Sequence, residues 1–248
     1  MSTRSDLVYV LLFAIGWPLY EYFIDWPAFQ RRLRKAPLSA RLREYQVTIA
    51  CQWLIVGVGV GLWLRANRSW SQLDLRAPTG IRLWIAAAVL VLLAAGYASQ
   101  ARKVARHERA RAQVRKALAS MEAILPHNGA EFTWFLIASA TAGVCEEFLY
   151  RGFFNWALAP WLSWWGAAAL SVPAFGLLHA YQGKKGIVRT GVVGAIMTLV
   201  VASTRSLLPA MALHSLIDVG AGTVTWIAFR DTQVGDQPRG DPASPART

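Results

Sequence analysis

Seven apolar blocks divide the chain, and each is about as long as a membrane-spanning helix. They cover residues 7–24, 47–64, 83–98, 132–159, 161–178, 187–202 and 207–229. At a rise of about 1.5 Å per residue, about 20 apolar residues cross a hydrocarbon core about 30 Å thick. Blocks of this length rarely recur in large soluble helical proteins. The pattern predicts an all-α, polytopic transmembrane bundle of about seven to eight spans.

Composition agrees with a membrane protein. Apolar residues make up 55% of the 248 positions and charged residues only 16%. A soluble domain is usually less apolar and more charged. The first apolar block has no small-residue cleavage site after it, so we expect it to be retained as a span and not removed as a signal peptide.

Positive charge gathers in three segments between the apolar blocks. The net charge is +12, and the basic residues cluster in segments 26–45, 100–126 and 184–189. The positive-inside rule places these segments in the cytoplasm. With seven spans the N-terminus is then outside and the C-terminus inside. Loop 65–82, which holds four arginines, also falls outside, against the rule, so the rule leaves the topology of the first half open.

The chain divides into three parts on these patterns. Residues 1–130 hold the first spans, their basic cytoplasmic loops and a basic amphipathic helix. That helix lies between two spans, where contact with anionic lipid accounts for its charge, so we expect a lipid bilayer and no nucleic acid as its partner. Residues 131–229 form the membrane core that carries the function. Residues 230–248 are polar and rich in Pro and Gly, which is typical of a disordered tail.

Ionisable side chains within the apolar blocks concentrate in the second half of the chain. They are Glu146, Glu147, Arg151, His179, His214 and Asp218. Such groups are costly inside a membrane and usually mark an interior site or pathway. The first half has few of them away from the ends of its blocks, which indicates a supporting role for the earlier spans.

The glutamate pair predicts two different roles. Glu147 and Arg151 are four residues apart, so they lie on one helical face and can form an ion pair. Glu146 points about 100° away around the helix axis and has no such local partner. A buried acid without a charged partner is a stronger base near neutral pH. We therefore expect Glu147 to anchor and Glu146 to react, although both could be purely structural.

Two further motifs repeat the four-residue spacing. Phe175 and His179 share one helical face, and His214 and Asp218 share another. Polar groups on one stripe of each of three helices suit convergence on a single interior point. Either histidine could instead serve only as an interhelical hydrogen-bonding group. Phe175 is expected to pack and not to react.

A count of helical rise tests this convergence. With a turn at Pro160, Glu146 and His179 lie about 21 Å and 28 Å from it on antiparallel helices, so their depths agree within about 7 Å. His214 comes only six residues after the bend near Leu208, at a depth of about 9 Å. We therefore expect His214 to match the other two poorly unless a helix is tilted or irregular.

Together the three motifs resemble those of the CPBP family. These intramembrane glutamate proteases include the type II CAAX prenyl endopeptidases and the bacterial Abi proteins. The motifs read Glu146-Glu147-x-x-x-Arg151, Phe175-x-x-x-His179 and His214-x-x-x-Asp218, and the resemblance covers residues 131–220. It implies a multi-pass protein of the bacterial inner (plasma) membrane that hydrolyses a membrane-embedded or membrane-proximal peptide or protein substrate.

The resemblance also implies roles for the site residues, with no cofactor and no metal. Glu146 and His179 would activate water for attack on a peptide carbonyl, with Glu147, Arg151 and Phe175 as supporting residues. His214 and the residue at 218 would stabilise the oxyanion. Asp218 departs from the asparagine of the prenyl endopeptidases. Because an ionised aspartate repels a developing negative charge, Asp218 could orient His214 instead, or carry a proton.

Two other functions stay open on the sequence. Glu146, His179, His214 and Asp218 also make a plausible zinc set, although no His-Glu-x-x-His helix is present. A non-catalytic transporter or immunity protein would use the buried acids to bind a partner or to relay protons, but no inverted repeat is visible. The sequence makes no prediction of the substrate's identity or of the oligomeric state.

Overall fold

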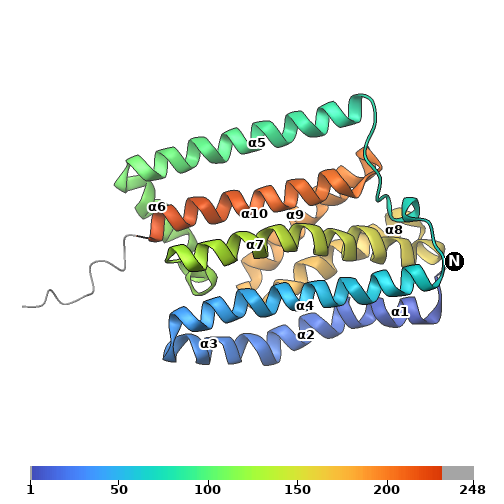
Figure 1. The fold of residues 1–248 in the computed structure, drawn as a ribbon, viewed down its shortest axis with the longest axis horizontal. Helices are drawn as coiled ribbons and strands as arrows, with labels where there is room; N and C mark the ends of the chain where they lie inside the picture. Colours follow the sequence, from blue (N-terminus) through green and yellow to red (C-terminus); the bar gives the residue numbers. More distant parts are fainter. Residues whose placement is uncertain (1, 231–248) are drawn as a thin grey trace, which may run out of the picture.

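The computed structural model describes residues 2–230 (Figure 1). Within that range the chain is helical, has no β-strand, and folds into a bundle of long helices. The predicted all-α polytopic bundle is therefore confirmed. Residues 231–248 of the predicted disordered tail lie outside the described residues. The division of the chain at residues 130 and 229 stays a prediction.

Ten α-helices form the bundle within residues 2–230. They are α1 (Arg4–Leu11), α2 (Trp17–Tyr20), α3 (Trp26–Lys35), α4 (Pro37–Arg65), α5 (Ile81–Arg106), α6 (Glu108–Leu118), α7 (Gly129–Glu147), α8 (Asn155–Leu178), α9 (Gly183–Thr204) and α10 (Leu207–Phe229). Three π-helical turns continue these helices, at Leu12–Gly16, Glu21–Asp25 and Phe148–Phe154. Short 3₁₀ segments lie at Trp70–Leu73, Ala119–Ile124 and Ala180–Gln182. Because the π-helical turns keep helical backbone angles, α1 to α3 act as one span.

Six continuous helical stretches of the described chain are long and apolar enough to cross a membrane. The longest, Gly129–Leu178, doubles back at Ser163, where a φ of 61° breaks the helix. Beyond that point the Ser171 hydroxyl donates to the Tyr150 carbonyl at 3.4 Å, so the two arms lie side by side. Seven spans result, as predicted, but the turn falls at Ser163 and not at Pro160. Proline removes only one helical hydrogen bond, and the helix continues past it to Ser163.

The three basic segments lie at one end of the bundle, called the basic end below (Figure 1). These segments are residues 26–45, 100–126 and 184–189. Arg41 Nε donates to the Ala123 carbonyl at 3.0 Å, and Arg189 Nη2 lies 2.8 Å from Met121 Sδ. The first and third segments thus both contact the second. The positive-inside rule assigns this end to the cytoplasm.

The arginine-containing loop between α4 and α5 lies at the opposite end, beside the start of α1 (Figure 1). Arg68 in this loop donates to both carboxylate oxygens of Asp6, at 2.9 and 2.7 Å. Its guanidinium also lies 4.4 Å from the centroid of the Trp156 ring. Asp6, the acidic member of this ion pair, is only 1% exposed. At least one arginine that departs from the positive-inside rule is therefore neutralised and fastens the loop to the first span.

A glycine allows α7 and α10 to approach closely at the middle of the bundle. A Cβ at Gly143 would overlap Ser215 Oγ and would lie 2.9 Å from the Met211 carbonyl oxygen. Gly143 lies just before the paired glutamates, and Ser215 directly follows His214. The absence of a side chain at position 143 therefore helps to bring these two polar motifs into contact.

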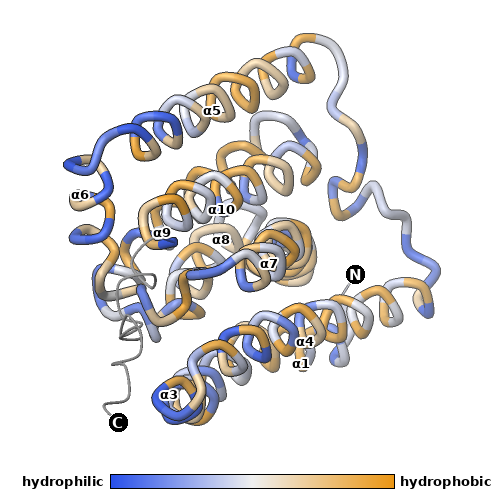
Figure 2. The backbone as a smooth tube through the Cα atoms, turned by 60° about the vertical axis from the view of Figure 1, so that its left-hand side comes forward, coloured by the Kyte–Doolittle hydropathy of each residue, from blue (hydrophilic) through white to orange (hydrophobic). Residues whose placement is uncertain are grey.

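Apolar side chains cover the outside of the bundle. Figure 2 shows hydrophobic residues along the helices and the most hydrophilic stretches at the end that holds α3 and α6. On α5, Trp84 and Leu92 are 71% and 72% exposed. A surface of large exposed apolar side chains is typical of contact with lipid and not with water. The chain is thus an integral, multi-pass membrane protein.

Candidate active site

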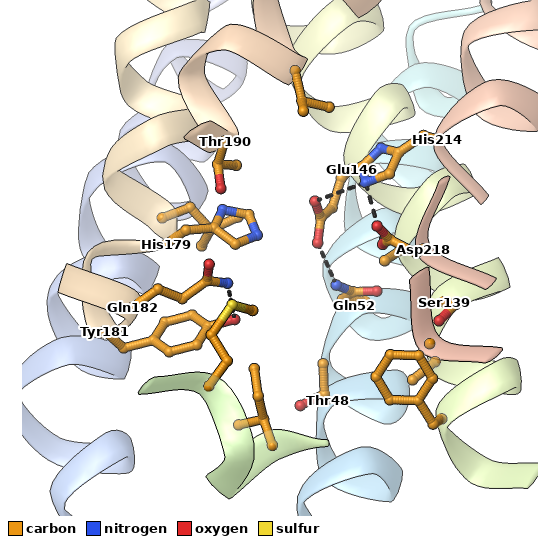
Figure 3. A pocket seen from close by; sticks show the side chains of 18 of the residues that line it. Thr48, Gln52, Ser139, Glu146, His179, Tyr181, Gln182, Thr190, His214 and Asp218 are labelled. Carbon is orange, nitrogen blue, oxygen red and sulfur yellow. Dashed lines mark hydrogen bonds and ion pairs between the residues drawn. The ribbon is translucent and has the colours of Figure 1, made fainter. Parts of the chain in front are cut away.

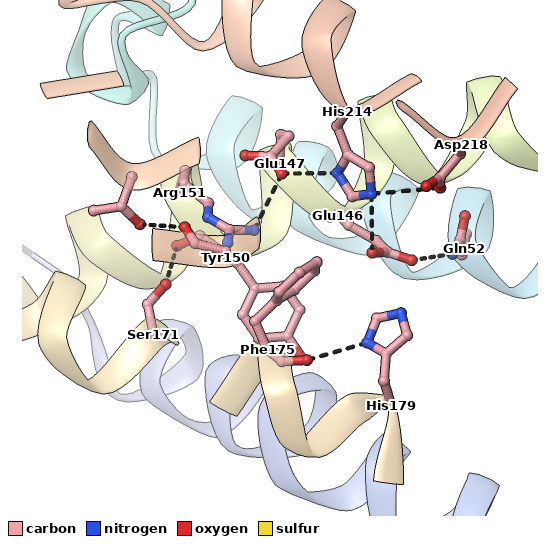
Figure 4. Close-up of polar contacts among 12 residues, drawn as sticks. Gln52, Glu146, Glu147, Tyr150, Arg151, Ser171, Phe175, His179, His214 and Asp218 are labelled. Atoms are coloured by element: carbon pink, nitrogen blue, oxygen red, sulfur yellow. Dashed lines mark hydrogen bonds and ion pairs between the residues drawn. The ribbon is translucent and has the colours of Figure 1, made fainter. Parts of the chain in front are cut away.

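The paired glutamates end α7 and face different directions (Figure 4). Glu147 is fully buried, and its Oε1 accepts hydrogen bonds from Arg151 Nη1 at 3.1 Å and from His214 Nδ1 at 2.8 Å. The ion pair expected from the four-residue spacing is therefore present, and it also holds a histidine of α10. Glu146 instead lines a cavity.

Arg151 is enclosed on all sides by other helices. It lies in the π-helical turn that follows Glu147, and π-helical turns within helices often occur at functional sites. Its guanidinium lies 4.2 Å from the centroid of the Phe175 ring. On α9, a Cβ at Gly194 would lie 2.6 Å from Arg151 Nη2 and 2.9 Å from Phe175 Cδ1, so a side chain there would displace one of them. Phe175 packs against the guanidinium, and its role as a supporting residue stays a prediction.

His214 lies among three carboxylates. Because the Glu147 carboxylate can only accept, the His214 Nδ1–H donates to it. The other ring nitrogen, Nε2, lies 3.9 Å from Glu146 Oε2 and 3.6 Å from Asp218 Oδ2 (Figure 4). The structure thus joins His214 to both glutamates and to Asp218, one helical turn further along α10.

The expected poor depth match of His214 is wrong. That expectation placed the turn before α10 at the same level as the turn between the arms of the α7–α8 hairpin. In the structure Leu207, at the start of α10, packs against Gly152, where a Cβ would lie 3.0 Å from Leu207 Cδ1. Gly152 lies 11 residues before the turn at Ser163. The start of α10 therefore lies deep in the bundle, and His214 reaches the level of the glutamates.

His179 lies on the opposite wall of the cavity from Glu146 (Figure 3). It is the residue at which α8 ends, and its Nδ1 lies 3.2 Å from the Phe175 carbonyl oxygen. Since a carbonyl only accepts, Nδ1 carries the proton of this contact and Nε2 is left as the acceptor nitrogen. The centroid of the Phe175 ring lies 5.3 Å from that of His179 and 5.9 Å from that of His214. Phe175 thus contacts both imidazoles.

The cavity between these walls has a volume of about 490 Å³. Its polar lining includes Glu146, His214 and Asp218 on one wall and His179 on the opposite wall. Apolar side chains such as Phe13, Trp17 and Leu149 also line it. Residues of the basic end line the other part, among them Tyr45, Leu118, Met121, Gln182 and Arg189. The cavity therefore leads from the glutamates toward the basic end, and it mixes a polar wall with an apolar one.

A comparison with protein families identifies this part of the chain. Residues 128–220 match the family model described as Type II CAAX prenyl endopeptidase Rce1-like. This segment is similar to the CAAX protease family. The Rce1-like segment is under half of the chain and contains all three motifs, and the resemblance drawn from those motifs is confirmed. At the level of the family, the match supports a CAAX-type intramembrane protease. No curated protein and no solved structure matches the chain.

One polar contact at the site comes from outside the Rce1-like segment and is missed by the motif analysis. Gln52 on α4 donates from Nε2 to Glu146 Oε1 at 2.9 Å (Figure 3). An uncharged amide does not stand out beside charged residues in an apolar block. The available signal is that Thr48 and Gln52 are four residues apart, which places two polar side chains on one face of α4. Both line the cavity.

The zinc alternative depends on whether the four candidate ligands converge. Among residues 2–230, no group of three or more His, Cys, Asp or Glu side chains is arranged to hold a metal ion. His179 stands across the cavity from Glu146, and the long Nε2 contacts of His214 join it to carboxylates and not to the second imidazole. The described residues therefore offer no ready metal site.

Proposed function

We propose that this protein is an intramembrane endopeptidase in which Glu146 and His179 activate a water molecule for attack on a peptide bond. The observation that carries the proposal is that both side chains face one cavity from opposite walls. Glu146 Oε2 has no hydrogen-bond partner among the described residues, and His179 Nε2 is the acceptor nitrogen of its ring. Two proton acceptors across a cavity suit the removal of a proton from water between them.

The proposed reaction is a general-base hydrolysis. Glu146 takes a proton from water, and the water oxygen forms a bond to the carbonyl carbon of the substrate. In the tetrahedral intermediate the former carbonyl oxygen carries the negative charge. When the C–N bond breaks, Glu146 returns its proton to the leaving amine, so that a carboxylate and an amine are released. His179 accepts a hydrogen bond from the same water and holds it in line for the attack.

His214 serves as the hydrogen-bond donor to the oxyanion. Glu147 binds the Nδ1–H of His214 and so turns Nε2 toward the cavity. Arg151 shares the same Glu147 oxygen, which offsets part of the cost of burying the carboxylate. A protonated Nε2 then donates to the oxyanion, and a preorganised donor of this kind is a large part of catalysis in acyl transfer.

Asp218 acts through His214 and not on the oxyanion directly. Its Oδ2 lies 3.6 Å from His214 Nε2, and its side chain is 38% exposed to the cavity side. A carboxylate at this distance favours the protonated imidazole that the oxyanion requires. This role accounts for an acidic residue where the prenyl endopeptidases have an amide.

The substrate enters from the basic end. The cavity leads there from Glu146, and the positive-inside rule places that end in the cytoplasm. The apolar wall of the cavity suits a substrate segment that carries hydrophobic groups. We therefore infer a membrane-embedded or membrane-proximal peptide substrate whose cleaved bond is reached from the cytoplasmic side.

The proposal is tested with purified protein and a defined probe. The probe is a quenched fluorescent peptide that ends in a prenylated CAAX sequence, because the family description names this substrate class. Glu146→Gln keeps the size of the side chain and removes the base, so we expect it to lower the cleavage rate about 100-fold or more. Cleavage by the wild type should persist after treatment with a chelator.

A second buried glutamate provides the matched control. Glu131 is 1% exposed and lies outside the cavity lining, where it accepts a hydrogen bond from the His127 backbone at 2.7 Å. Glu131→Gln should lower the melting temperature and leave the rate per folded molecule within a few-fold of wild type. Normal cleavage by the Glu146→Gln variant would overturn the proposed mechanism.

A further inference from the structure

Gln52 places a polar amide in the membrane-spanning part of α4. It lies on α4, between apolar neighbours that face lipid, such as Leu54 at 69% exposure. Its side chain points into the cavity, where Nε2 donates to Glu146 Oε1 at 2.9 Å (Figures 3 and 4). A carboxylate oxygen cannot donate, so this contact fixes which end of the amide faces Glu146.

The contact divides the two oxygens of Glu146 between two tasks. Gln52 occupies Oε1, and Oε2 is the oxygen without a hydrogen-bond partner in the described chain. Oε2 is also the oxygen on the side of His214, 3.9 Å from its Nε2. A single hydrogen bond from Gln52 thus restrains the rotation of the Glu146 carboxylate and keeps Oε2 on the side of His214.

The other end of the same amide argues against a purely stabilising role. Gln52 Oε1 is buried and has no hydrogen-bond partner among the described residues. A buried acceptor without a donor costs stability, and an apolar side chain would suit the span better. An interhelical hydrogen bond that served packing alone would be expected to satisfy both ends of the amide.

We propose that Gln52 is a positioning residue for Glu146, so that the N-terminal spans, outside the Rce1-like segment, complete the catalytic site. The proposal rests on the proposed function, because the reaction requires Glu146 Oε2 to face the water. Gln52 touches Glu146 and not the reacting atoms, so its loss misdirects the base without emptying the cavity. Small displacements of a catalytic group are known to cost large factors in rate.

The kinetic test compares two glutamines of α4, of which only Gln52 lines the cavity. Gln52→Leu removes the amide at similar volume, and Gln46→Leu makes the same change at an exposed position outside the cavity lining. With the prenylated CAAX peptide as probe, we expect Gln52→Leu to lower kcat about tenfold or more while KM stays within about threefold. Gln46→Leu should keep both constants within about twofold. Gln52→Met, of the same length as glutamine, replaces the leucine variant should that variant not fold.

A second measurement does not depend on activity. The melting temperatures of Gln52→Leu, Glu146→Ala and the double variant form a cycle in detergent, and the same cycle is measured with Gln46→Leu. Residues in contact give non-additive effects, whereas independent residues give additive ones. We expect the 52–146 cycle to be non-additive and the 46–146 cycle to be additive.

The outcomes separate the two proposals. If wild type cleaves the probe and Gln52→Leu keeps kcat within twofold, the positioning role is wrong and the proposed function stands. An equal loss of kcat in Gln46→Leu would also overturn it, because the effect would then belong to α4 in general. If wild type does not cleave the probe, the proposed function fails for this substrate class, and the thermal cycle alone decides: additive losses overturn the Gln52 contact, and non-additive losses uphold it.

Discussion

At the scale of single residues, the site depends on one carboxylate oxygen that serves two partners. Glu147 Oε1 accepts from Arg151 and from His214, and Arg151 in turn stacks on Phe175. All four side chains are buried. In a weakly polar interior each of these charges is tolerated only because the others are present. The group therefore acts as a unit, and the loss of one member leaves another without compensation.

This dependence can be measured with Arg151→Leu. The variant leaves the buried Glu147 carboxylate unpaired, and we expect it to lose about 3 kcal/mol or more of stability. Adding Glu147→Gln removes the orphaned charge, so the double variant should be more stable than Arg151→Leu alone. Thermal unfolding in detergent gives both values. Additive losses would show that the two side chains do not share a buried pair.

At the scale of helices, the contact between α7 and α10 sets the register of the polar motifs. Gly143 allows the backbone of α10 to approach at Ser215, next to His214. The same crossing holds His214 Nδ1 at 2.8 Å from Glu147. A wider crossing would separate these groups even if every side chain of the motifs were unchanged.

Gly143→Ala tests the crossing. The added methyl group has no space, so we expect a loss of about 1–3 kcal/mol of stability together with reduced cleavage of the prenylated peptide. Gly96→Ala is the control, because a Cβ there meets no atom within 4 Å and Gly96 lies within α5. This second change should raise stability by about 0.5–1 kcal/mol. If both variants had wild-type melting temperatures and activity, the close contact between α7 and α10 would not be required for stability or cleavage.

Helical periodicity predicts contacts within one helix more reliably than the level at which separate helices meet. The spacing of Glu147 and Arg151 predicted their ion pair, because the 3.6-residue period fixes that geometry. The predicted depth of His214 was wrong, because the level at which α10 starts depends on the packing of Leu207 against Gly152. Gln52 carries no charge and lies 94 residues before Glu146, so only the tertiary fold reveals their contact.

At the scale of the whole molecule, the ends of the bundle are chemically different. Three basic segments gather at the end toward which the cavity leads. At the other end the loop between α4 and α5 packs over the spans, with Leu73 and Leu207 buried at 2% and 0% exposure. The arrangement predicts an orientation in the membrane as well as a direction of substrate entry.

Single cysteines test this orientation. Ser39 at the basic end and Ser71 in the opposite loop are both exposed. After Cys51 is replaced by serine, an impermeant maleimide added to intact cells should label Ser71→Cys and not Ser39→Cys. Permeabilised cells should show labelling at both positions. Cys145 is fully buried and provides little background. The reverse pattern in intact cells would invert the predicted topology.

The tight packing at the end opposite the basic end bears on the leakage of protons across the membrane. Trp63, Phe153 and Leu207 are all 0% exposed, and none of these three residues lines the cavity. Water that reaches Glu146 from the basic end therefore meets a layer of buried side chains before the opposite end. A cavity closed in this way can hold water within the bilayer without opening a continuous path for protons across the membrane.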